Sequence, residues 1–288
     1  MTDRIEVKKT YKTYIGGNFP RTESGRSYKV YDEDENFFAN ACRCSRKDVR
    51  DAVLAAREAF DGWKSRTAYN RGQILYRIAE MLEGRKAQFV EELTVFGSSE
   101  KEARNEVYAA IDRLIYYAGW SDKFQQVYST VNPVASNHFN FSIPDPMGVV
   151  SVLAPQNSAL LGLVSVIAPI IVGGNTCVVL AARNSPNVAI SFAEVLHSSD
   201  VPGGIVNLLT GFREELIPHL SSHMDVNAFF YTEELDQETR KQIDENAALN
   251  VKRVVKELQD SWDTPEAQNP ELIMNFQEIK TTWHPIGN

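Results

Sequence analysis

The sequence predicts an α/β protein, with a parallel, doubly wound sheet, a layer of long helices before it and a small β element beside it. One observation is a strand–helix–strand pattern in residues 147–182, where short Val-rich runs flank an apolar helix. Another is the alternation of strands and helices that continues to residue 258. A third is helical periodicity over residues 45–120. Alternating units of this size are typical of parallel sheets covered by helices.

The N-terminal half predicts three long helices packed as one layer. Ser45, with Asp48 three residues later, forms a capping-box pattern at the start of the first helix. Apolar residues at helical spacing predict a second helix over Tyr69–Phe96. A third helix should begin at Ser98 or Ser99.

Residues 159–182 contain no charged side chain and are long enough to cross a bilayer. Pro169 and the pair Gly173-Gly174 interrupt this run. These residues mark a helix end and a turn, so we expect a buried helix followed by a buried strand instead of a membrane span.

The remaining α/β units follow in order. Helices are expected over Asn187–His197, Glu214–Ser221 and Asp236–Ala247, and strands over Ile205–Thr210, Val226–Tyr231 and Val251–Leu258. Residues 127–146 lose the helical period and contain HFNFSIPDP, which predicts an edge strand or projecting hairpin. The final FQEIKTTWHPIG predicts a strand that pairs with a distant strand or with another subunit.

Composition excludes several classes of protein. The net charge of −8 argues against a nucleic-acid-binding surface. The first residues have no apolar leader, and three cysteines do not make a disulfide framework in a chain of this length. We therefore expect a cytoplasmic protein without nucleic-acid or membrane partners.

No common catalytic motif is present. The sequence lacks G-x-x-x-x-G-K-[ST], G-x-S-x-G, G-x-G-x-x-G and H-E-x-x-H. Cation binding is conceivable at Cys42 and Cys44, at the acidic run 32–35, or at His219 and His223. The cysteine pair and the histidine pair have too few ligands, and four adjacent acids in a polar loop are usually solvated, so we expect no metal site.

The order of segments resembles the NAD(P)-dependent aldehyde dehydrogenases over most of the chain. The matching segments are IGGNF, DVRDAVLAAREAFDGWKS, RGQILYRIAEMLEGR, YYAGWSDK, PMGVVSVLAPQN, APIIVGGNT, VPGGIVNLLTG, SHMDVNAFFYT and NVKRVVKEL. The sequence is most similar to the C-terminal module of the double-length, family-16 members, which is regarded as lacking a catalytic domain.

The resemblance implies a particular domain organisation. A Rossmann-like cofactor-type domain should comprise residues 1–134 and 148–258, and oligomerisation strands should lie in 135–147 and 272–288. Residues 259–271 should form a linker that replaces the catalytic domain.

The resemblance also assigns two catalytic positions. Asn157, within PQN, matches the amide that helps to stabilise the oxyanion in family members, and Gln156 replaces the tryptophan before it. Glu257 matches the general base. The family's nucleophilic cysteine should follow this Glu, but no cysteine follows it here. Because the family's thioester chemistry requires a thiolate, we expect Asn157 and Glu257 to be vestigial and the protein to be inactive alone.

The cofactor positions implied by the resemblance are degenerate. Leu180 and Arg183 stand where a Lys and a Glu hold the adenosine ribose in the family. Glu233 and Glu234 replace the Gly-Ser beneath the pyrophosphate, where two carboxylates would repel it. We expect no bound cofactor, with NAD or NADP as the alternative.

Three functions remain open from the sequence. The first hypothesis is that the protein is a non-catalytic structural or regulatory subunit of a catalytic aldehyde dehydrogenase, pairing with that enzyme or with itself through the C-terminal strand. Alternatively, it binds a nucleotide or another anion, with Arg183 facing phosphate. The third hypothesis is that it contributes Asn157 or Glu257 to NAD-dependent aldehyde oxidation within a complex.

Overall fold

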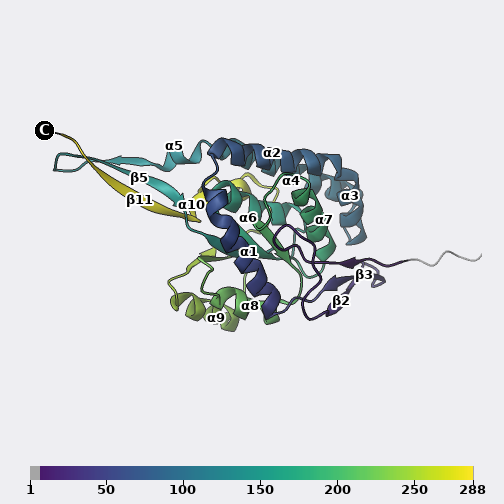
Figure 1. The fold of residues 1–288 in the computed structure, drawn as a ribbon. Helices are drawn as coiled ribbons and strands as arrows, with labels where there is room; N and C mark the ends of the chain where they lie inside the picture. Colours follow the sequence, from purple (N-terminus) through teal and green to yellow (C-terminus); the bar gives the residue numbers. More distant parts are fainter. Residues whose placement is uncertain (1–6, 288) are drawn as a thin grey trace, which may run out of the picture.

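A parallel sheet forms the centre of the protein in the computed structural model, which describes residues 7–287 (Figure 1). Within these residues its strand order is β10-β9-β6-β7-β8. The strands are β6 (Val149–Leu153), β7 (Thr176–Leu180), β8 (Val206–Leu209), β9 (Ala228–Tyr231) and β10 (Arg253–Lys256). The predicted α/β class and parallel sheet are confirmed. Because the chain runs outward from β6 in both directions, the sheet reverses its order between β6 and β9, where ligands commonly bind in such folds.

Helices cover both faces of this sheet. One face carries α6 (Leu161–Val172) and α7 (Pro186–His197), with α2 (Ala68–Gly84), α3 (Lys86–Val95) and α4 (Glu100–Trp120) outside them. The opposite face carries α1 (Arg46–Lys64), α8 (Arg213–Ser222) and α9 (Gln237–Ala248).

The prediction of one layer of N-terminal helices is therefore wrong. The apolar stripe of α1 packs on the sheet together with Val149 and Leu153 of β6. Val150 and Val152 of the same strand belong to the core on the other side, which includes α2, α3 and α4. Because alternate residues of a strand point to opposite faces, a strand that is buried along its whole length can contact helices on both faces of the sheet.

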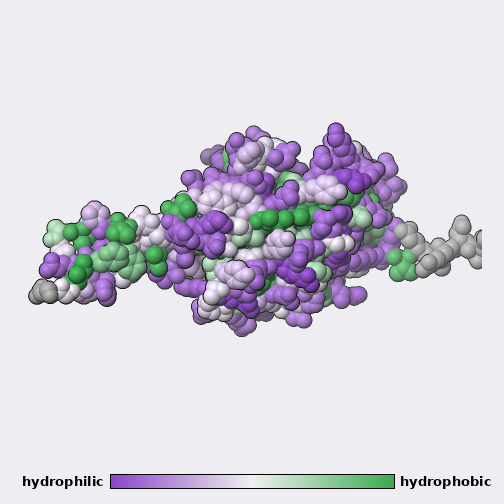
Figure 2. All heavy atoms as spheres, turned by 90° about the horizontal axis from the view of Figure 1, so that it is seen from above, coloured by the Kyte–Doolittle hydropathy of each residue, from purple (hydrophilic) through white to green (hydrophobic). Residues whose placement is uncertain are grey.

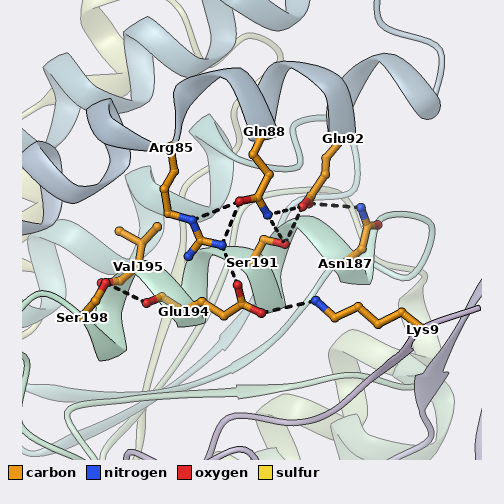
Figure 3. A network of polar contacts seen from close by, with 9 residues as sticks. All are labelled: Lys9, Arg85, Gln88, Glu92, Asn187, Ser191, Glu194, Val195 and Ser198. Atoms are coloured by element: carbon orange, nitrogen blue, oxygen red, sulfur yellow. Dashed lines mark hydrogen bonds and ion pairs between the residues drawn. The ribbon is translucent and has the colours of Figure 1, made fainter.

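The single helix expected over Tyr69–Phe96 is in fact two helices. Arg85 separates α2 from α3 with a non-helical φ of −111°. Its guanidinium donates hydrogen bonds to Gln88 on α3 and to Glu194 on α7, at 2.8 and 2.5 Å (Figure 3). Lys9 from the N-terminal segment donates to the same Glu194 carboxylate at 3.3 Å (Figure 3). The break thus coincides with a polar network that joins three parts of the chain.

The predicted helix starts are confirmed. Ser45 precedes α1, and its backbone N–H donates to Asp48 at 2.7 Å. Ser99 precedes α4, and its side chain accepts from the Glu102 N–H while Glu102 accepts from the Ser99 N–H. These reciprocal bonds satisfy amide groups that a helix N-terminus otherwise leaves free.

The long uncharged run divides as expected into α6 and β7. Gly174, with φ of +93°, lies in the turn between them. Among residues 7–287, no helix has the length and apolar character needed to cross a membrane.

Two smaller sheets flank the centre. Near the N-terminus lie β1 (Thr10–Tyr11), β2 (Ser27–Tyr31) and β3 (Phe37–Cys42). A second sheet projects from the body and contains β4 (Thr130–Asn132), which follows α5 (Phe124–Tyr128), β5 (His138–Pro146) and β11 (Gln277–Pro285), in the order β11-β5-β4 (Figure 1). The projecting hairpin and the pairing of the last strand with a distant one are thus confirmed.

The segment expected as a linker, residues 259–271, is folded against the body. It contains the short helix η1 (Pro265–Gln268) and leads into α10 (Glu271–Met274), so the last strand begins at Gln277 and not at residue 272. Trp262 and Ala267 are buried. Apolar side chains within a turn-rich stretch supply the packing that the prediction missed.

Candidate functional site

The carboxyl edge of the central sheet brings together the positions singled out in the sequence. Gln156, which follows β6, accepts a hydrogen bond from the Arg183 N–H beyond β7 at 2.9 Å. Its amide group also donates to the carbonyl of Ala154 at 3.3 Å. Gln156 therefore links the ends of two neighbouring strands, using both ends of its side chain.

Leu180 and Arg183 have separate environments. Leu180 is buried between its register neighbours Leu153 and Leu209, within the core cluster of the α1 face. The Arg183 guanidinium is exposed and lies 4.4 Å from the centre of the Phe212 ring. A cation at this distance is attracted by the ring face.

The acidic pair after β9 is neutralised by basic neighbours. Glu233 forms an ion pair with Arg213, whose guanidinium also donates to the Ala154 carbonyl at 2.8 Å. Glu234 pairs with Lys256 at 2.9 Å, and this contact lowers the pKa of the Glu234 carboxyl. The two carboxylates are thus less free to repel an anion than the sequence suggested. The Arg213 guanidinium nevertheless lies across the end of β6.

An acidic side chain of the protein caps the N-terminus of α9. Asp236 caps this helix, and its carboxylate accepts from the Thr239 N–H at 2.9 Å and from the Thr239 hydroxyl at 2.7 Å. A helix N-terminus attracts negative charge, and here a side chain of the protein supplies it.

A groove of about 720 Å³ lies between α8 and α9, beside this capped end. Its charged lining comprises Arg213, Glu214, Glu234, Asp236, Glu238, Lys241 and Glu245. Five acidic and two basic side chains give the lining a negative balance. Such a surface repels a phosphate-bearing ligand.

Asn157 is engaged by the segment that follows the sheet. The indole N–H of Trp262 donates to the Asn157 side-chain oxygen at 3.0 Å. Trp262 is only 6% exposed, whereas Asn157 itself is exposed, so the contact lies at the edge of the packed segment. The side-chain oxygen of Asn157 thus accepts a hydrogen bond from a residue outside the sheet.

Glu257 is engaged in the same way. The side-chain amide of Asn275, just after α10, donates to the Glu257 carboxylate at 2.8 Å. The backbone N–H of Glu257 donates to the Tyr231 carbonyl at 3.2 Å, which extends the β9–β10 pairing. Both positions predicted to be catalytic thus have partners from residues 259–276.

Arg113, on α4, binds residues 259–276 to the body of the protein through hydrogen bonds. The sequence analysis did not single out this residue. The side chain is 3% exposed, and burial lowers the pKa of its guanidinium. It donates to the carbonyls of Trp262 and Ala267, at 2.7 and 2.6 Å, and to the Ser165 hydroxyl. The available signal was an arginine next to the apolar stripe of a helix, adjacent to Leu114.

Comparison with known proteins identifies the family. Residues 20–260 match the model of the aldehyde dehydrogenase family. The chain belongs to this family. The predicted family membership is therefore confirmed, while the likeness to the family-16 C-terminal module stays a prediction.

Several proteins similar to this aldehyde dehydrogenase family member are dehydrogenases by name. Cytosolic 10-formyltetrahydrofolate dehydrogenase of Mus musculus is 31% identical, over 88% of this chain and 29% of the relative. Aldehyde dehydrogenase, cytosolic 1, of Elephantulus edwardii is 30% identical, over 93% and 52%. The NAD⁺ complex of an aldehyde dehydrogenase from Bacillus cereus has a TM-score of 0.81 and 25% identity, over 87% and 51%. The chain spans about half or less of the length of these proteins.

The thiols of this aldehyde dehydrogenase family member are all inside the protein. Cys42, Cys44 and Cys177 are buried, and burial raises the pKa values of Cys44 and Cys177. A thiolate nucleophile needs the opposite environment. Within residues 7–287 no group of three side chains suited to metal ligation occurs, and His219 and His223 have pKa values lowered by burial.

Proposed function

We propose that this chain is a non-catalytic member of the aldehyde dehydrogenase family that acts as a structural or regulatory subunit of a catalytic aldehyde dehydrogenase. The observation that carries the proposal is the path of the chain between β10 and β11. Residues 259–276 lead from one strand to the other and contact Asn157 through Trp262 and Glu257 through Asn275. The resemblance implies a catalytic domain with its cysteine at this point, and these residues contain none.

The residues at the sheet edge do not fit a dinucleotide. Leu180 offers no polar group for a ribose, Asp236 occupies the helix end suited to a pyrophosphate, and Arg213 lies across the end of β6. The bound NAD⁺ of the Bacillus cereus structure belongs to that protein. We infer that this chain does not hold NAD or NADP, and that any oxidation occurs on the partner subunit.

The test is an activity measurement with and without a partner. The purified chain is mixed with NAD⁺ or NADP⁺ and a panel of aldehydes, and formation of reduced cofactor is followed by absorbance. No turnover and no heat of cofactor binding in calorimetry are expected. The chain should co-elute with a catalytic aldehyde dehydrogenase from the same organism and change that enzyme's activity or stability. Turnover by the chain alone, or no complex with the enzyme, would refute the proposal.

A second candidate is anion binding, favoured by the arginines around Phe212. Arg43 and Arg183 lie 4.6 and 4.4 Å from this ring. Arg183 also lines a cavity of about 460 Å³, whose other charged residues are Lys29, Asp32 and Glu33. Calorimetry with adenine nucleotides, on the wild type and on Arg183→Ala, tests this function. Binding that depends on Arg183 supports it, and the absence of heat excludes it.

A further inference from the structure

The carboxylate of Glu92, on α3, is directed inward towards α7 (Figure 3). Charged side chains are typical of protein surfaces, and the face of this protein seen from above is largely hydrophilic (Figure 2). Glu92 is instead half-buried. Its carboxylate accepts hydrogen bonds from the Ser191 hydroxyl at 2.7 Å, the Gln88 amide at 2.7 Å and the Asn187 amide at 3.3 Å (Figure 3). Two of these donors belong to the first turns of α7, so Glu92 joins α3 to the start of that helix.

The cations beside Glu92 bind a different acid. Lys9 and the Arg85 guanidinium both form ion pairs with Glu194, at 3.3 and 2.5 Å (Figure 3). Among residues 7–287, Glu92 forms no ion pair with a lysine or an arginine. An ionised carboxylate that is removed from water without a cation is unfavourable, because hydrogen bonds alone must replace its hydration.

A proton on Glu92 is compatible with the same contacts. The Ser191 hydroxyl can donate or accept, so it can accept from a protonated Glu92 while its own hydrogen turns to a carbonyl one helical turn back. The side-chain oxygen of Asn187 is buried and has no hydrogen-bond partner among residues 7–287. The cluster therefore has an unsatisfied acceptor when Glu92 is ionised, and protonation adds a donor to it.

We propose that Glu92 is a proton-sensitive contact between α3 and α7. The protonated carboxyl holds the two helices together, and loss of the proton weakens the contact. Pro186 begins α7 directly after Ser185, so the weakened contact extends to the loop that carries Arg183 at the carboxyl edge of the sheet. This inference does not depend on the proposed role as a subunit.

The sign of the pH dependence follows from the burial of this carboxyl. Burial raises the pKa of Glu92 above its ordinary 4.5 and outweighs the opposing effects of its hydrogen bonds and of the Lys9 charge. The unfolded chain regains the ordinary pKa, so the folded state binds more protons above pH 4.5. The contribution of Glu92 to stability is therefore complete below this pH and is lost as the pH rises through the folded-state pKa.

The other titratable groups around this carboxyl respond differently. Burial opposes ionisation of Glu194, but the hydrogen bond from Arg85 contributes to a pKa that is lowered overall. Burial raises the pKa of Tyr11 to about 12, so this phenol keeps its proton at neutral pH. His197, also on α7, packs against the ring of Tyr14 and is common to the wild type and to the variants that test the proposal.

Urea unfolding of the full chain at about pH 5 and about pH 8 tests the proposal. Glu92→Gln keeps the size of the side chain and removes its charge. Its unfolding midpoint should exceed that of the wild type at pH 8, and the difference should shrink at pH 5. Glu91→Gln is the matched control on an exposed position of α3 and should show no such difference. A Glu92→Gln midpoint at or below that of the wild type at pH 8, or an equal effect of Glu91→Gln, would overturn the proposal.

Hydrogen exchange locates the effect and requires the wild type alone. After correction for the intrinsic exchange rates, the protection of amides 190–195 in α7 should fall severalfold between about pH 5 and about pH 8. The amides of α1, on the opposite face of the sheet, are the internal reference and should change less. Constant protection of α7, or an equal fall in α1, would contradict the proposal.

Discussion

The connection between Arg113 and the segment after β10 gives a quantitative prediction. Arg113→Met removes the guanidinium and keeps most of the aliphatic length of the side chain, so the change tests hydrogen bonding more than packing. The carbonyls of Trp262 and Ala267 and the hydroxyl of Ser165 lose their charged donor.

The expected cost follows from these three bonds. A hydrogen bond to a charged group contributes about 1.5–3 kcal/mol, and a buried acceptor left without a donor costs about 1–3 kcal/mol. Part of this loss is offset, because the variant no longer buries a guanidinium without a carboxylate partner. We therefore expect Arg113→Met to lower the free energy of unfolding by about 2–4 kcal/mol.

Urea unfolding measures the loss, and limited proteolysis shows where it acts. The variant should be cut within residues 259–276 more rapidly than the wild type, because this segment loses its main attachment. Arg77→Met is the matched control. Its exposed ion pair with Glu80 should be worth less than about 0.5 kcal/mol. A loss of less than about 1 kcal/mol in Arg113→Met, with unchanged cleavage, would refute the reasoning.

Other substitutions test other parts of the site. Trp262→Phe removes the N–H that binds Asn157 and should cost about 1 kcal/mol in urea unfolding, whereas a neutral effect would mean that the contact is not formed. Leu180→Lys should cost about 2–4 kcal/mol without producing heat of NAD binding in calorimetry, because an ammonium enters the core. Burial lowers the pKa of Lys252 from 10.5 to about 8, so the unfolded state binds more protons between these values. Stability should therefore rise with pH across this window, and the rise should be smaller in Lys252→Met, as unfolding at about pH 7 and pH 10 would show.

Local signals predicted helix starts better than helix breaks or the surfaces that helices cover. Ser45 and Ser99 cap the helices they were expected to cap because capping depends on neighbouring residues. The break at Arg85 was missed because Leu82 and Phe89, on either side of it, remain at helical spacing and are both buried. A stripe of apolar residues also does not state which face of a sheet it will contact, as the position of α1 illustrates.

The candidate site was predictable in position but not in its contacts. Strand order placed Asn157 and Arg183 at the carboxyl edge, as the resemblance implied. The partner of Asn157 is Trp262, which is far along the chain in a stretch whose turn signals predicted a linker. The partner of Glu257 is Asn275, which follows that stretch. A tryptophan within the polar run QDSWDTPEAQNP was the visible sign that this stretch is buried.

The contacts of Trp262 and Asn275 give Asn157 and Glu257 a structural role. A substitution of Asn157 or Glu257 would now leave a buried or half-buried polar group without its partner, so both residues are maintained by folding even where no reaction takes place. An asparagine and a glutamate at these positions are thus no evidence of turnover in proteins that share this connecting segment.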